Sequence, residues 1–111
     1  MNVLLVMYLV IGLLTVLISL PLIAGWVKPN YFYGFRIRAT LADPETWYKV
    51  NKYFAQRLLL AGLAQTFASI ALYFVSGGNE DMYALSVLAV FVVGFSIAMA
   101  QSMRYLRSLP K

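Results

Sequence analysis

The sequence contains no cysteine and no histidine among its 111 residues. Without cysteine, the chain can form no disulfide and offers no thiol nucleophile. Without histidine, it lacks the usual ligand of zinc and haem and the commonest general base. Only four carboxylates are present, Asp43, Glu45, Glu80 and Asp81. We therefore expect no metal, no cofactor and no enzyme, and only a lipid-modifying activity based on a single carboxylate stays open.

Charge is also scarce, since charged residues make up 12% of the chain and hydrophobic residues 62%. Soluble domains have about one quarter charged and about one half apolar residues. The first charged residue is Lys28, and the apolar run 3–26 before it is long enough to cross a hydrocarbon core of about 30 Å. A cleavable signal peptide would instead have a basic segment before a shorter apolar run. We expect an all-α, polytopic membrane protein that keeps this first span.

Two further apolar runs predict transmembrane helices over about 58–75 and 82–103. The turn between them, 76–81, contains two glycines that relieve the backbone and two acidic residues that favour the positive end of the next helix dipole. The second and third spans should therefore form a tight antiparallel hairpin. With a tail at 104–111, the chain is expected to be a single membrane domain.

The nine lysines and arginines predict the orientation of the chain. Six of them lie in residues 27–57 and three in residues 104–111. Because cationic loops stay in the cytoplasm, we expect the amino terminus outside and the carboxyl terminus inside. The anionic lipid of the inner leaflet is then the expected partner of the net charge of +5, and no nucleic acid is needed to explain it.

The loop after the first span contains residues suited to a tight fold. Pro29 cannot continue a helix, so we expect the first span to end there. Asn30 and Gly34 tolerate positive φ. The guanidinium of Arg36 can form several fixed hydrogen bonds to loop carbonyls, to Asp43 or to a phosphate, which lysine cannot reproduce. The alternative is that Arg36 only attracts anionic lipid, as any cation would.

Two N-caps compete for the start of the next helix. Thr40 with Asp43 resembles a capping box, but it would place Pro44 at the fourth helical position, where its missing N–H is needed. Asp43 as the N-cap with Pro44 at the first helical position has no such conflict. We therefore predict a helix that begins at Pro44.

From Pro44 onward the pattern predicts an amphipathic helix, to about residue 57, that lies along the cytoplasmic interface and runs into or hinges onto the second span. Its apolar stripe consists of Trp47, Val50, Phe54 and Leu58, and its polar face of Glu45, Lys49, Lys52 and Gln56. Asn51 lies beside the apolar stripe, where it can hydrogen-bond the preceding loop.

The same segment carries a family resemblance. Its matching elements are Pro29-Asn30, Tyr33-Gly34-Phe35-Arg36, Thr40-Leu41, Asp43-Pro44-Glu45 with Trp47, and Asn51-Lys52. As a set they resemble the signature loop of the SdpI family, with departures at Ile37, where the family often has threonine, and at Ala55, where it tends to have glycine. The resemblance covers about one third of the chain. It implies a membrane protein of a prokaryotic plasma membrane that gives immunity to a secreted killing peptide and, in some members, holds a transcriptional repressor at the membrane.

From this resemblance and the loop chemistry, we expect a ligand or partner, either a peptide toxin or a regulatory protein, to bind at the loop. The candidate residues are Asn30, Tyr33, Gly34, Arg36, Thr40, Asp43, Trp47 and Asn51. Inside the bilayer, small or weakly polar residues favour close helix packing and allow a homo-oligomer. These packing candidates are Gly62, Gln65, Ser69, Gly94 and Ala98.

Two other functions stay open from the sequence. The chain can be an accessory or structural subunit that buries its small-residue faces against a larger membrane complex. It can also bind or transport a small molecule or a lipid, although the absence of charge in the middle of the spans disfavours ion-coupled transport.

Overall fold

The computed structural model describes residues 2–30, 34–36 and 38–109. These residues form four helices, α1 (Asn2–Ala24), α2 (Arg38–Ala42), α3 (Pro44–Val75) and α4 (Glu80–Ser108), and the described residues contain no strand. Three of the helices, α1, α3 and α4, are long and apolar enough to cross a membrane. The expected all-α fold with three membrane spans is confirmed, and the chain is a multi-pass membrane protein.

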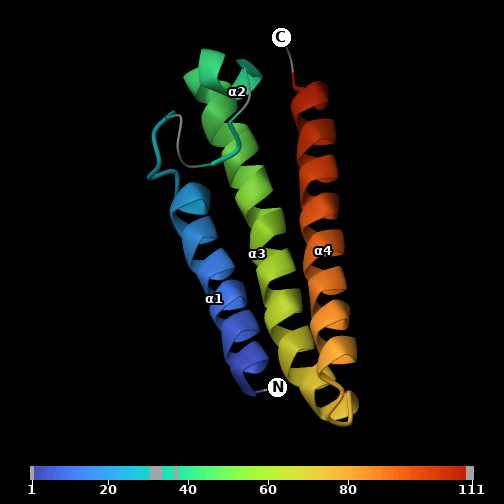
Figure 1. Cartoon of the computed structure of the whole chain (residues 1–111). Helices are drawn as coiled ribbons and strands as arrows, with labels where there is room; N and C mark the ends of the chain where they lie inside the picture. The colour runs from blue at the N-terminus through green and yellow to red at the C-terminus, as the bar shows by residue number, and fades with distance from the viewer. Residues whose placement is uncertain (1, 31–33, 37, 110–111) are drawn as a thin grey trace.

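Helix α3 is the central element, with α1 packed on one side and α4 on the other (Figure 1). The start of α1 and the turn between α3 and α4 lie at one end of the bundle. At the other end, the segment between α1 and α3 folds against the first turns of α3, close to the last turns of α4. This second end is called the loop end below.

Helix α1 ends at Ala24, five residues before Pro29, which we had expected to terminate it. Gly25 adopts a φ of +75°, and its N–H donates to the Leu22 carbonyl at 3.3 Å. The Trp26 N–H donates to the Pro21 carbonyl at 3.0 Å. These paired bonds are a Schellman motif, which glycine favours because it enters the left-handed region without strain. Gly25 therefore ends α1 before the chain reaches Pro29.

Helix α3 begins at Pro44 with Asp43 as its N-cap, the start chosen from the proline geometry. It then continues to Val75 without a break, so the segment 44–57 and the second span are a single helix. The continuous helix differs in detail from the prediction that the segment 44–57 lies in the plane of the interface. The apolar stripe does not face the bilayer surface, because Val50, Phe54 and Leu58 are buried in a cluster with Phe35 and residues from the end of α4.

The turn between α3 and α4 is built as its composition predicts. Gly77 and Gly78 adopt positive φ values of +63° and +87°. Asn79 caps α4, and its side-chain oxygen accepts from the Met82 N–H at 3.1 Å. The helix therefore starts at Glu80, with both acidic residues in its first turn, and extends to Ser108 beyond the predicted end of the span.

Small residues bring the helices close together. A methyl group added at Gly62 would lie 3.1 Å from the Thr15 side chain of α1, and one added at Gly94 would lie 3.3 Å from Cβ of Ala61 on α3. Ala98, also on α4, is buried. Both helix contacts therefore depend on side chains that are small or absent.

Polar residues join the same helices. Gln65 is fully buried, and its Nε2 donates to the Tyr8 carbonyl of α1 at 2.9 Å and to the Ser69 hydroxyl at 3.2 Å. The Tyr83 hydroxyl of α4 donates to the Ser69 carbonyl at 2.9 Å. Gln65 and Ser69 of α3 are thus hydrogen-bonded to α1 and to α4, respectively.

Candidate functional site

The candidate site lies at the loop end, where two side chains of α3 reach into the preceding segment. Trp47 is fully buried, and its indole Nε1 donates to the Val27 carbonyl at 2.9 Å. A buried tryptophan is stabilised both by its large apolar area and by a partner for its single N–H. Trp47 therefore anchors the chain just after α1 to the second turn of α3.

The Asn51 side chain hydrogen-bonds to backbone groups in the loop. Its Oδ1 accepts from the Phe35 N–H at 2.5 Å, and its Nδ2 donates to the Phe35 carbonyl at 3.4 Å and to the Trp47 carbonyl at 3.0 Å. Only 1% of Asn51 is exposed. A buried amide with partners on both sides fixes the loop in register with α3.

Thr40, in the short helix α2, completes this arrangement. Its hydroxyl donates to the Phe35 carbonyl at 2.8 Å, and the whole residue is buried. The Phe35 ring is also buried and lies 5.3 Å, between ring centroids, from Phe54 of α3. The backbone and the side chain of Phe35 are thus both held in place.

Gly34 is required by the space around it. Its φ is +110°, and a Cβ there would lie 2.6 Å from Asn51 Oδ1 and 3.3 Å from the Trp47 ring. Any other residue would be strained and would displace the amide that holds Phe35. Gly34, Thr40, Trp47 and Asn51 therefore form a single structural unit, called the loop clamp below.

The remaining candidates lie at the surface. Arg36 and Asp43 are exposed, and Asn30 is partly buried, with its Nδ2 donating to the Lys28 carbonyl at 2.7 Å. Asp43 accepts from the Glu45 N–H at 3.2 Å and from the Thr46 hydroxyl at 2.9 Å, as an N-cap does. Tyr33 lies outside the described residues. The structure thus separates candidates that build the loop from candidates that face outward.

The outward surface carries more positive than negative charge. Lys28, Arg36 and Lys52 are exposed, whereas the carboxylate of Glu45 is paired with Lys49 at 2.9 Å. A cavity of about 200 Å³ lies nearby, between the start of α3 and the end of α4. It is lined by Asp43, Glu45, Thr46, Lys49 and Leu109.

The polar side chains of the loop clamp are engaged within the chain itself. The side-chain polar atoms of Thr40 and Trp47, like those of Asn51, are bonded to backbone groups of the loop and of α3. The described residues contain no group of three acidic side chains that could hold a metal ion. The loop end therefore combines a fixed backbone with exposed cationic side chains.

Sequence reasoning missed two features. The first is the role of Val27 and Phe35, whose backbone groups receive the bonds from α3; their apolar side chains give no signal of this role. The second is a hollow between α3 and α4 beside Arg57. For that hollow a signal was present, because Arg57 follows Tyr53 by one helical turn and precedes a run of purely apolar and small residues.

The family model of the SdpI/YfhL protein family matches residues 27–102. The match includes the loop, α2, α3 and most of α4. Neither a search of curated proteins nor a search of solved structures found a match. The chain belongs to the SdpI/YfhL family.

Proposed function

We propose that this member of the SdpI/YfhL family protects a bacterial cell against a secreted killing peptide. In this proposal it acts by binding a ligand or regulatory partner at the cytoplasmic face of the plasma membrane, with its amino terminus outside, and it catalyses no reaction. The single observation that carries the proposal is the clamp on Phe35. The Phe35 backbone, held by Asn51 at 2.5 Å and by Thr40 at 2.8 Å, fixes the chain immediately before the exposed Arg36.

A fixed backbone favours binding because less conformational freedom is lost when the partner arrives. Arginine adds specificity, since its planar guanidinium pairs with a carboxylate or phosphate through two parallel hydrogen bonds. A loop that served only to attract anionic lipid would need neither a buried asparagine nor a glycine at a φ of +110°. The loop clamp therefore supports a specific contact at Arg36.

The charge of this surface indicates the chemistry of the partner. Exposed cations predominate, and the carboxylate of Glu45 is already paired with Lys49. An acidic segment of a peptide or of a regulatory protein is complementary to such a surface. The resemblance to the SdpI family implies both kinds of partner, the killing peptide and a repressor held at the membrane.

A protection assay tests the proposal. The chain is expressed in a bacterium that is sensitive to an Sdp-type peptide, and survival is measured after challenge. We expect wild type to protect and Arg36→Lys to lose most of the protection, because lysine keeps the charge but not the paired hydrogen bonds. The comparison is the double variant Lys49→Gln with Lys52→Gln, which removes two cations of the same surface and should reduce protection much less than Arg36→Lys, because exposed charges contribute mainly general attraction.

Equal membrane insertion of all variants is checked first by fractionation. If wild type is inserted and gives no protection, the immunity function is wrong. If Arg36→Lys protects fully while the double variant does not, the loop acts only as a cationic anchor, and the specific contact is wrong.

A further inference from the structure

A hollow between α3 and α4 lies at a different place from the loop clamp. Its volume is about 290 Å³. It is lined by Arg57, Leu60, Ala61, Gly94, Ile97, Ala98 and Gln101. Its lining includes Gly94 and Ala61, and a Cβ added at Gly94 would lie 3.3 Å from Cβ of Ala61. Its rims are Leu60 and Ile97, which are 56% and 51% exposed and therefore border the lipid-facing surface.

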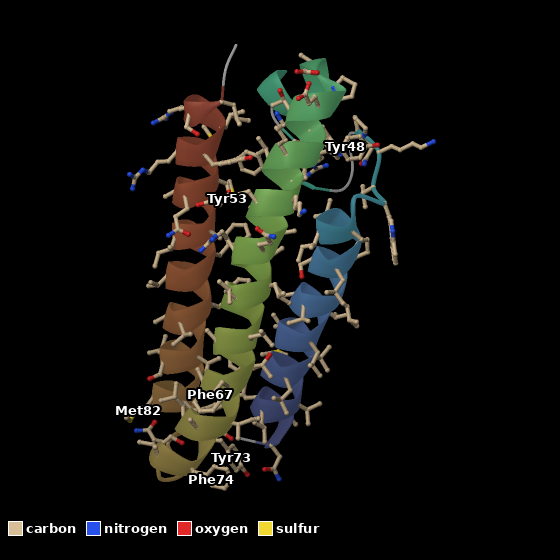
Figure 2. All side chains as sticks on the ribbon, turned by 180° about the vertical axis from the view of Figure 1, so that it is seen from behind. Tyr48, Tyr53, Phe67, Tyr73, Phe74 and Met82 are labelled. Carbon is tan, nitrogen blue, oxygen red and sulfur yellow. The ribbon has the colours of Figure 1, made fainter. Side chains whose placement is uncertain are left out.

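Arg57 closes the hollow toward the loop end. Its guanidinium carbon lies 5.0 Å from the centroid of the Tyr53 ring, one turn earlier in α3, and the Tyr53 ring stacks on Tyr105 of α4 at 4.5 Å. In Figure 2, Tyr53 lies between these two helices. Among the described residues, the buried Arg57 Nε has no hydrogen-bond partner, and a buried donor on a cation that lacks a partner is costly. The residue as a whole is partly exposed and lines the hollow, so an anionic acceptor can approach its guanidinium from there.

A second hollow of about 360 Å³ adjoins the first, because both are lined by Gln101. Its other lining residues are Tyr53, Arg104 and Tyr105. None of the described residues that line either hollow is acidic. The surface between α3 and α4 therefore changes from cationic and aromatic at the loop end to purely apolar farther along the span.

The depth of Arg57 can be estimated from the far end of α3. The helix ends at Val75, just before the polar turn that leads into α4. With a rise of about 1.5 Å per residue, Arg57 Cα lies roughly 27 Å from Val75 Cα along the helix, and a hydrocarbon core is about 30 Å thick. The side chain turns back toward Tyr53, so its guanidinium reaches toward the level of lipid phosphates.

We propose that this groove between α3 and α4 binds one anionic phospholipid of the surrounding leaflet. The phosphate accepts hydrogen bonds from the Arg57 guanidinium and pairs with Arg104 at the mouth. One acyl chain lies over Ala61 and Gly94, between the rims formed by Leu60 and Ile97. The first hollow, at about 290 Å³, is close to the lower end of the roughly 300–1,000 Å³ of ligand pockets and can hold part of one acyl chain.

Lipid titration of the purified full chain tests the groove. Native mass spectrometry measures the apparent Kd for phosphatidylglycerol and for phosphatidylcholine with the same acyl chains, at about 0.15 M ionic strength, where exposed charges beyond about 8 Å are largely screened. We expect phosphatidylglycerol to bind about tenfold more tightly, and Arg57→Gln and Arg104→Gln each to weaken it about tenfold, the factor for one charge-assisted hydrogen bond.

The matched controls are Lys52→Gln on α3 and Arg107→Gln on α4. Both remove one exposed cation from the same helices, but neither residue lines the groove, so each should change the Kd by less than about threefold. Helix content and melting temperature confirm that each variant is folded. If Arg57→Gln fails to fold because its contact with Tyr53 is lost, Arg104→Gln, whose side chain is exposed, decides alone.

Three outcomes would overturn the proposal. Equal binding of phosphatidylcholine would show that the groove does not select an anion. Equal losses from the groove variants and the controls would show general attraction to the surface. Saturable binding of inorganic phosphate at concentrations where phosphatidylglycerol saturates would show a phosphate site that does not need the acyl chain.

Discussion

Replacing Asn51 by alanine should release the loop from α3 while leaving the membrane spans intact. The residue is buried, and its Oδ1 is the partner of the Phe35 N–H at 2.5 Å. Alanine removes this acceptor and leaves the N–H without a partner. The carbonyls that Asn51 also contacts are less affected, because the Phe35 carbonyl keeps its bond from Thr40 and the Trp47 carbonyl lies within the regular hydrogen bonding of α3.

The expected cost follows from that single orphaned donor. A buried polar group left without its partner costs about 1–3 kcal/mol, and the two longer bonds from Nδ2 add little, since one of them is 3.4 Å long. We therefore expect the local opening free energy to fall by about 2 kcal/mol. This corresponds to a roughly 30-fold loss of protection against hydrogen exchange at Phe35, because about 1.4 kcal/mol is a factor of ten.

Hydrogen exchange measured by mass spectrometry on the chain in detergent micelles reads this effect directly. Peptides covering residues 34–36 should lose protection, and peptides covering residues 62–69 of α3 should keep it. The control is Gln56→Ala, an exposed position on the same helix, which should leave both regions unchanged. A loss of less than about threefold at the loop, or an equal loss across both regions, would refute the assignment of Asn51 as a local clamp.

Three further outcomes follow from the structure. A reporter that works only in the cytoplasm should be active when it is fused after Lys111, and a reporter that works only outside the cell should be active when it is inserted at 77–78. The reverse pattern would show that the topology is inverted. Asp43→Ala should lower thermal stability by about 1 kcal/mol through loss of the N-cap, and a silent substitution would contradict that role. Gly12→Ala should destabilise the bundle by about 1–3 kcal/mol in thermal unfolding, because the added methyl overlaps side chains of α3. Gly94→Ala, where the nearest atom is 3.3 Å away, should cost less, and an equal cost would refute the packing argument.

The membrane fold could be predicted from composition because three long apolar runs leave few alternatives. The start of α3 was also predictable, since Pro44 tolerates only the first helical turn and Asp43 is a suitable cap. The continuity of α3 was not predictable in the same way. The change from charged to apolar residues near Arg57 marks a change of environment, but backbone hydrogen bonds pass through it because no glycine or proline interrupts the helix there.

The candidate site was predictable in its residues and less so in their roles. The sequence pattern identifies Asn51, Thr40 and Gly34 as unusual, but it does not say whether the partner is a ligand or the chain itself. The structure gives each of them a partner or a neighbour within the loop and α3. Asn30 shows the same limit, because it was expected to tolerate positive φ, whereas the described residues have positive φ only at glycines.

The continuity of α3 also explains how two binding surfaces can share one short chain. Trp47 and Asn51 are four residues apart and lie on one face, toward the loop, whereas Tyr53, Arg57 and Ala61 follow at the same spacing on the face toward α4. A hinge between the segment 44–57 and the span would leave Arg57, which would move with Trp47 and Asn51, free to shift relative to the part of the groove formed by Ala61. Because a single helix carries both, the loop that presents Arg36 and the groove beside Arg57 keep a fixed relative orientation, one facing the cytoplasm and the other the adjoining lipid in the proposed topology.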